Sequence, residues 1–143
     1  MSAAEISVHN RQRKLRFDLS WLRRFAVKAL AECTLHAATP NTPLSQLESI
    51  EVSIVSDAVI ADVHVRFMQI EGPTDVITFE HGEILISSET AQMYAFKYGH
   101  PLETELGLYI IHGLLHLNGY DDLQKSDAAK MKKLQERVLK KLL

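Results

Sequence analysis

The stretch YIIHGLLHLNGYDD, residues 109–122, predicts the helix around which the rest of the chain is organised. His112 and His116 are four residues apart in it, so both imidazoles lie on one face of that helix, one turn apart. Leucine and isoleucine occupy most of the other positions, which predicts that the helix is buried. Because buried imidazoles need polar partners, this spacing predicts either a metal site or an ordinary pair of packed histidines.

The residues that follow His116 favour the metal site. Asn118-Gly119 ends the helix, since glycine adopts the left-handed conformation that turns the chain back. Asp122 follows three residues later, and the pattern H-x3-H-x2-G-x2-D then offers two nitrogens and one carboxylate oxygen. Zinc sites that activate water have three protein ligands and an open fourth position. We therefore expect His112, His116 and Asp122 to bind one Zn²⁺ per chain, or a similar divalent transition metal.

Two adjacent aspartates allow two roles. The segment DDLQ, residues 121–124, has the D-x-x-Q form of a capping box, so either aspartate could begin the last helix. The spacing from Gly119 assigns the metal to Asp122. Asp121 is then the expected helix cap, and it is also the candidate acceptor of a proton released in catalysis, a role that a substrate phosphate oxygen could take instead.

Gly113 bears on the type of reaction. In zinc peptidases with an H-E-x-x-H helix, a glutamate general base stands at this position. Its absence argues against a peptidase, the third reading of the motif. An ion with these ligands could still promote attack of water on a phosphodiester, because it also neutralises charge on the transition state.

Two segments resemble a known family. HGLLHLNGYDD, residues 112–122, is similar to the signature H-G-x-L-H-L-x-G-Y-D-H of the YbeY family. GPTDVITFEHGEILIS, residues 72–87, is similar to the family's P-T-D-V-L-S-F followed by G-D-I-x-I-S. The family comprises bacterial rRNA-maturation factors that are single-strand-directed, metal-dependent endoribonucleases. The resemblance covers most of the chain and implies that strand 73–79 borders the metal helix as one wall of a cleft.

Two positions depart from the family pattern. Asp122 stands where the family usually has a third histidine. Met68 stands six residues before Thr74, where the family commonly carries an arginine implicated in activity, and Arg66 does not occupy that position. The resemblance implies the fold more strongly than it implies catalysis.

Composition predicts one domain over residues 1–143, long enough to bury a core without disulfides. The chain has no apolar run of about 18 residues, and its N-terminal segment lacks the apolar core of a signal peptide. A soluble cytoplasmic protein that does not bind membranes is expected. The single cysteine, Cys33, is expected to be a core residue.

The net charge of −2 hides a segregation of charge. Residues 1–28 and 123–143 each hold seven Lys or Arg against two acids, whereas residues 29–122 hold two against fourteen. The C-terminal lysines form either a solvated helix face or, with the basic N-terminal segment, a surface that contacts phosphates. The acidic middle predicts that RNA is contacted through limited patches.

Hydrophobic periodicity predicts an α+β fold, a four-stranded mixed β-sheet packed with about five helices in the order β-α-β-α-β-β-α-α-α. Asp18 is expected to cap the first helix, and His81-Gly82 to form a hairpin turn. The proline-containing segment 38–45 is expected to be a loop. The order strand, helix, strand over residues 50–80 predicts a crossover between parallel neighbours. The expected strand segments are residues 6–8, 15–17, 50–54, 75–80 and 84–86.

The leading hypothesis is an endoribonuclease that cuts single-stranded RNA, with His112, His116 and Asp121 as catalytic residues. The resemblance implies a role in rRNA maturation and ribosome quality control, with ribosomal subunits or assembly factors as partners. The alternative is a non-catalytic ribosome-assembly or RNA-binding factor with a structural metal. Structural metal sites are closed, and catalytic ones keep an open position.

Overall fold

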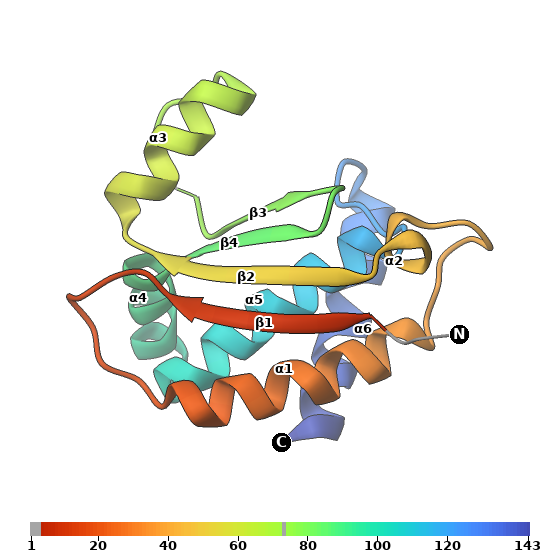
Figure 1. Cartoon of the computed structure of the whole chain (residues 1–143), viewed down its shortest axis with the longest axis horizontal. Coiled ribbons are helices and arrows are strands. Elements are labelled where there is room, and N and C mark those ends of the chain that lie inside the picture. Colours follow the sequence, from red (N-terminus) through yellow and green to blue (C-terminus); the bar gives the residue numbers. More distant parts are fainter. Residues whose placement is uncertain (1–3, 73) are drawn as a thin grey trace.

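A computed structural model describes residues 4–72 and 74–143, and within them it forms four strands and six helices (Figure 1). Pro73, where the expected cleft wall begins, lies outside the described residues, as do residues 1–3 of the N-terminal segment. The strands are β1 (Glu5–Asn10), β2 (Ser49–Val55), β3 (Val76–Phe79) and β4 (Glu83–Ser87). The helices are α1 (Leu19–Thr34), α2 (Pro43–Gln46), α3 (Asp57–Met68), α4 (Ser88–Tyr98), α5 (Leu102–Leu117) and α6 (Lys125–Leu142).

The sheet is mixed, with the strand order β1-β2-β4-β3. β2 pairs in parallel with both β1 and β4, and β3 pairs antiparallel with β4 through the predicted turn at His81-Gly82. The crossover predicted over residues 50–80 is wrong, because β4 lies between β2 and β3 and β3 returns antiparallel at the edge. α1 instead connects the parallel neighbours β1 and β2.

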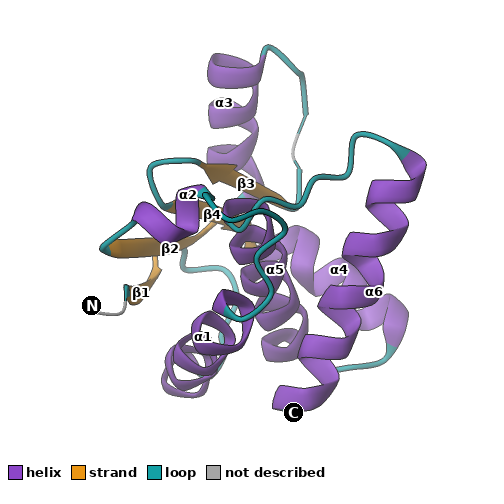
Figure 2. Cartoon of the chain, turned by 90° about the vertical axis from the view of Figure 1, so that its right-hand side faces the viewer, coloured by secondary structure: helices purple, strands orange, loops and turns teal. Residues whose placement is uncertain are grey.

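The main core lies between one face of the sheet and the helices α1, α5 and α6 (Figure 2). α5 runs through the middle of this layer and contacts α1, α4, α6 and the strands β3 and β4. Its apolar residues are accordingly buried on almost every side, as the sequence predicts. The fully buried side chains of α5 are Leu106, Ile110, Ile111, Leu114, Leu115 and Leu117.

α3 covers part of the other face of the sheet and projects from the body of the molecule (Figure 1). Ile60 packs there against Ile77 and Leu85 in a smaller apolar cluster. Most of the helix surface is solvent-exposed, and Ile60 is its one buried residue. Among the helices of more than one turn in the described part of the chain, α3 is therefore the least anchored.

Two predicted segments differ from the structure. Residues 15–17 do not form a strand, because Gln12 satisfies the backbone of Leu15: its Nε2 donates to the Leu15 carbonyl at 2.8 Å and its Oε1 accepts from the Leu15 N–H at 2.9 Å. The expected loop 38–45 runs into the short helix α2, which Thr42 and Ser45 cap reciprocally. None of the helices in the described part of the chain combines the length and apolar character required to cross a membrane.

Candidate metal centre

The end of α5 is fixed by Asn118, a buried residue directly after the helix. Its Nδ2 donates to the Cys33 carbonyl at 2.7 Å, and its Oδ1 accepts from the Thr42 hydroxyl at 2.8 Å. Gly119 then turns the chain with a φ of +99°, which a side chain would strain. A Cβ there would also meet the Thr42 methyl at 3.2 Å. These contacts hold the loop after α5 in one place, against α1 and α2.

His112 and His116 lie one turn apart on α5, as predicted, and their side chains meet. Their Nε2 atoms are 3.0 Å apart, and the rings are inclined at 82°. Both side chains are only partly exposed, at 21% and 27%. The pair is therefore at the surface of the core, where an ion can reach it from solvent.

The other ring nitrogen of each histidine is held by an oxygen. Tyr120 O accepts from His116 Nδ1 at 3.0 Å, and Gln135 Oε1 on α6 accepts from His112 Nδ1 at 2.9 Å. Because both oxygens accept, each neutral ring carries its proton on Nδ1, and both Nε2 atoms present lone pairs to the same point. Two lone pairs at this separation repel one another, so the arrangement suits a cation that both nitrogens can bind.

Asp122 completes the cluster. Its Oδ2 is 4.0 Å from His112 Nε2, and its Oδ1 is 4.0 Å from His116 Nε2. One ligand atom from each of the three residues lies within 4.8 Å of the others. Donors about 2.0–2.1 Å from a tetrahedral ion stand about 3.3–3.4 Å apart, and the separations here bracket that value. Two imidazoles held in the ligating tautomer and a half-exposed carboxylate fit a divalent transition metal.

The surroundings of His116 disfavour its charged form. Burial, and then the neighbouring His112 imidazole, lower the pKa of His116 below its ordinary value of 6.5, against the opposing effect of Asp122. A ring with a lowered pKa is neutral at neutral pH, which is the form that binds metals.

Asp121 lies outside this cluster. Its Oδ1 accepts from the Leu123 N–H at 3.2 Å and so forms a turn around the next two residues. The last helix begins at Lys125, with Gln124 at the N-cap position. The prediction that Asp121 caps α6 is therefore wrong, because its side chain is used in the turn that precedes the helix.

Gly113 packs directly under the sheet. A Cβ at this position would lie 2.8 Å from Ile84 Cδ1 of β4. The position thus has no room for the glutamate of a zinc peptidase. Steric crowding therefore excludes this class for the same position at which the sequence lacks the general base.

Met68, at the position where the family commonly carries an arginine, lies on α3. Met68 ends the helix and is 43% exposed. Arg66 Nε lies 3.3 Å from Asp62 Oδ2, one turn earlier on the same helix. Arg66 therefore does not take the place of a guanidinium at position 68.

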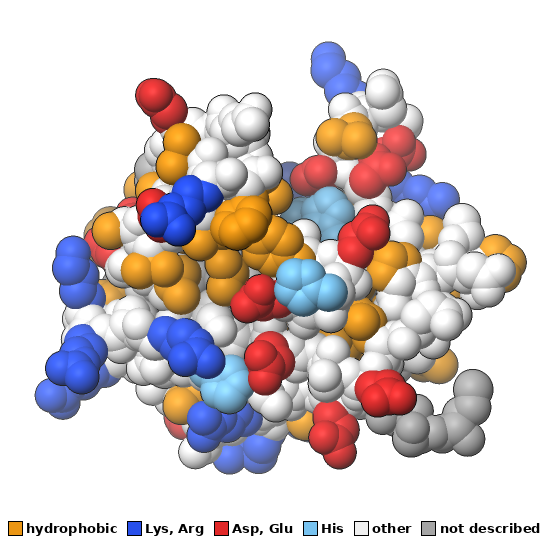
Figure 3. All heavy atoms as spheres, turned by 45° about the horizontal axis from the view of Figure 1, so that its top comes forward, with side chains coloured by type: hydrophobic (Ala, Val, Ile, Leu, Met, Phe, Trp, Pro, Cys, Tyr) orange, Lys and Arg blue, Asp and Glu red, His pale blue; other side chains and the backbone are white. Residues whose placement is uncertain are grey.

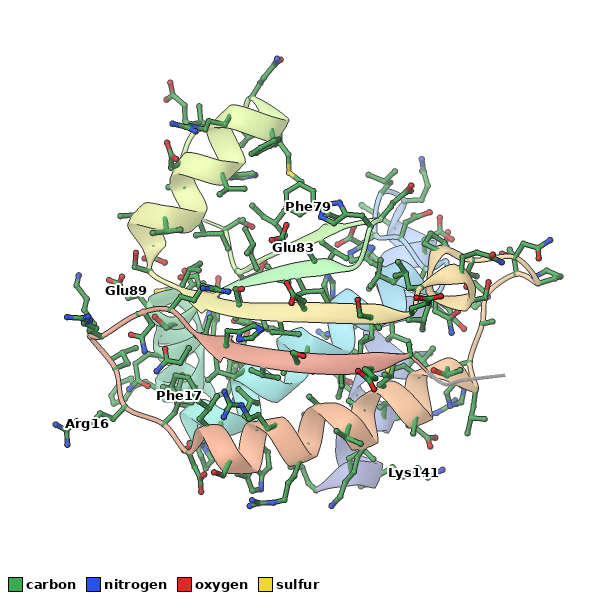
Figure 4. All side chains as sticks on the ribbon, in the orientation of Figure 1. Arg16, Phe17, Phe79, Glu83, Glu89 and Lys141 are labelled. Carbon is green, nitrogen blue, oxygen red and sulfur yellow. The ribbon has the colours of Figure 1, made fainter. Side chains whose placement is uncertain are left out.

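Basic side chains lie near both ends of α1. α6 packs on α1 at its C-terminal end, where Lys141 Nζ is 3.0 Å from Glu32 Oε1. Arg16 points into solvent from the loop before the other end of α1 (Figure 4). In the space-filling view, histidines and acidic side chains occupy the middle, and most Lys and Arg lie along one side (Figure 3). Basic side chains therefore do not cover the whole of this face.

The fold and this cluster define an α+β protein with two histidines and an aspartate gathered at the end of a buried helix. The fold is similar to the solution structure of TM1509 from Thermotoga maritima, with a TM-score of 0.63 over 96% of this chain and 88% of that chain, at 24% identity.

Sequence comparison identifies the family. The family model described as Endoribonuclease YbeY matches residues 7–143. An Endoribonuclease YbeY from Acholeplasma laidlawii is 37% identical over 106 residues, which are 68% of this chain and 77% of that protein. Another from Desulfitobacterium hafniense is 30% identical over 137 residues, 83% of this chain and 87% of that protein. The chain belongs to the Endoribonuclease YbeY family, which confirms the resemblance seen in the sequence.

Two residues of the site were missed from the sequence. Gln135 is 23 positions from His112 and on another helix, and no spacing rule connects them. Asn118 was recognised as part of a helix stop, but its bonds to Cys33 and Thr42 span 85 and 76 positions.

Proposed function

We propose that this protein is a metal-dependent endoribonuclease that cuts single-stranded rRNA, with one Zn²⁺ or similar ion held by His112, His116 and Asp122. The observation that carries the proposal is the convergence of two imidazole lone pairs and a carboxylate in a member of a family named for endoribonuclease activity. rRNA maturation, ribosome quality control and a cytoplasmic location belong to this proposal, with ribosomal subunits or assembly factors as partners.

The chain's own residues set the chemistry of the site. Gln135 and the Tyr120 carbonyl keep both Nε2 atoms free of protons and pointed at one position. Asp122, which is 49% exposed, leaves one side of the cluster open to water and substrate, as catalytic rather than structural sites require. The three residues would hold a divalent ion that would supply a water of near-neutral pKa and would neutralise charge on phosphoryl oxygens.

A proton must leave the attacking water. Asp121 is exposed, precedes the ligand Asp122, and has one carboxylate oxygen beyond the one used by Leu123. We assign it the role of proton acceptor, with a phosphate oxygen of the substrate as the competing acceptor. Gly113 leaves α5 without a glutamate base, so no acceptor is available on the helix at that position.

The test pairs metal content with RNA cleavage. The wild-type protein should contain close to one transition-metal ion per chain and cut a fluorescent single-stranded RNA. His116→Ala should lose both, because two ligands remain. His81→Ala is the matched control, since His81 lies in the β3–β4 turn, is exposed, and pairs with Glu83 at 3.2 Å. Full metal content in His116→Ala would end the site assignment.

The non-catalytic alternative is favoured by one observation, the absence of a guanidinium at Met68 and the pairing of Arg66 with Asp62. In that reading the protein binds RNA or the ribosome and keeps the metal for stability. Met68→Arg separates the two: cleavage by the wild type supports the enzyme, and cleavage that arises only in Met68→Arg supports the binding factor.

A further inference from the structure

We propose that a cavity beside the metal centre is a binding subsite for a guanine base of the RNA, an inference that rests on the proposed function. The cavity has a volume of about 510 Å³ and lies between α4, α5 and α6. This volume is within the range of about 300–1,000 Å³ typical of small-molecule sites. Gln135 lines the cavity and also holds His112, so a base bound there is one side chain away from the metal ligands.

The walls of the cavity are aromatic. Tyr94, Tyr98 and Tyr109 line it, which are three of the four tyrosines in the chain. The Tyr94 and Tyr98 rings are stacked on α4, with centroids 5.9 Å apart and planes inclined at 18°. Bases of single-stranded RNA stack on such side chains, because every base has a π-face. The walls therefore suit a flat, unpaired base.

The charged groups of the cavity favour a base over a phosphate. Glu105 is 2% exposed, and its Oε1 is 2.5 Å from His100 Nε2. Burial, and then the neighbouring Glu105 carboxylate, raise the pKa of Tyr109 well above its usual range. Glu105 is thus a buried residue of the cavity wall whose Oε1 is held by His100. Its carboxylate makes this part of the cavity unfavourable for an anion.

Two further carboxylates are available to a ligand. Asp75, which precedes β3, and Glu136 on α6 both line the cavity and are exposed. Asp75 Oδ1 accepts from the Val76 N–H at 2.8 Å and from the Thr74 hydroxyl at 3.4 Å, whereas Oδ2 takes part in no hydrogen bond within residues 4–72 and 74–143. Guanine presents two adjacent donors on one edge, N1–H and the N2 amino group, and these match a carboxylate. Adenine and cytosine offer one amino group beside an acceptor, which a carboxylate repels, and uracil offers a single N–H between carbonyls.

Lys132 lines the same cavity from α6 and is exposed. Its positive charge can pair with the phosphate of the nucleotide whose guanine base lies between the tyrosine rings. One lysine of the basic C-terminal segment thereby gains a specific place in RNA binding.

Guanosine binding tests the cavity without depending on cleavage. Titration of the metal-free and metal-loaded protein, followed by tyrosine fluorescence or calorimetry, should show guanosine binding at least about tenfold tighter than adenosine or uridine. Glu136→Gln and Tyr98→Ala should each weaken guanosine binding about tenfold. The matched controls Glu80→Gln and Phe96→Ala, exposed residues outside the cavity, should leave it unchanged. Equal binding of all nucleosides, or insensitivity to both cavity variants, overturns the proposal.

Cleavage distinguishes failure of the subsite from failure of the proposed function. Single-stranded oligonucleotides with one guanosine should be cut at a fixed distance from it, and Glu136→Gln should abolish that preference while retaining cleavage. Cutting without any base preference overturns the subsite and leaves the nuclease intact. If no RNA is cut, the proposed function fails, and the guanosine titration alone decides whether the cavity binds a base.

Discussion

Gln135 is the residue whose replacement tests the metal centre without touching a ligand. Its amide oxygen accepts from His112 Nδ1 at 2.9 Å and so keeps Nε2 free for metal. Gln135→Met preserves the length of the side chain and removes the acceptor. A hydrogen bond of this kind contributes about 0.5–1.5 kcal/mol, and the ring must also be kept in the ligating tautomer. We expect metal affinity to fall about 10- to 100-fold, as it does when such supporting residues are removed from other sites.

Competition with a chromophoric chelator measures that affinity. Thermal unfolding of the metal-free protein should change little, because Gln135 lies half-buried on the surface of α6. Gln135→Glu should retain or strengthen binding, since a carboxylate makes the imidazole a better donor. Gln92→Met is the matched control, on the exposed side of α4. Unchanged affinity in Gln135→Met would refute the argument that this hydrogen bond orients His112 as a ligand.

Three further predictions concern separate positions. Asp122→Ala should lose metal and cleavage together. Asp122→His should keep the metal and shift the pH–activity profile to lower pH, because a neutral ligand leaves more positive charge on the ion. If metal content depends on Asp121 and not on Asp122, the roles of the two aspartates are reversed. Gly113→Ala should destabilise the fold by about 1–3 kcal/mol in chemical denaturation, because its Cβ would lie 2.8 Å from Ile84 Cδ1, and unchanged stability would mean that the sheet moves freely over α5. Burial raises the pKa of the Cys33 thiol from 9.0 to about 12. The unfolded chain therefore loses this proton at lower pH than the folded protein, and the free energy of unfolding falls as pH rises between those two values. Cys33→Ala should flatten that part of the stability–pH curve, and an unchanged slope would contradict the burial argument.

Local patterns predicted most of the elements. Asp18 caps α1 as expected, since its side chain accepts from the Trp21 N–H at 3.0 Å. The four-residue spacing of His112 and His116, and their distance from Asp122, predicted which side chains come together. These features depend on helix periodicity and on turns of a few residues, which the sequence encodes directly.

The predictions that were wrong or incomplete concern features that depend on contacts between residues distant in the sequence. Others depend on a side chain that forms the hydrogen bonds a neighbouring strand would otherwise form. The pattern of residues 15–17 suits a strand, but the Gln12 amide satisfies Leu15 before a strand can pair. The position of β4 between β2 and β3 depends on its parallel pairing with β2, a strand about 30 residues earlier, which no local pattern specifies. Gln135 could be found only once α6 was placed beside α5.

The most direct test of the metal centre is an anomalous-scattering map of crystals of the zinc-loaded wild-type protein, recorded at the zinc edge. One strong peak is predicted within about 2.0–2.2 Å of His112 Nε2, His116 Nε2 and a carboxylate oxygen of Asp122, with a fourth position open to solvent. A peak bound by other residues, a site closed by a fourth protein ligand, or no peak between the two imidazoles would contradict the account.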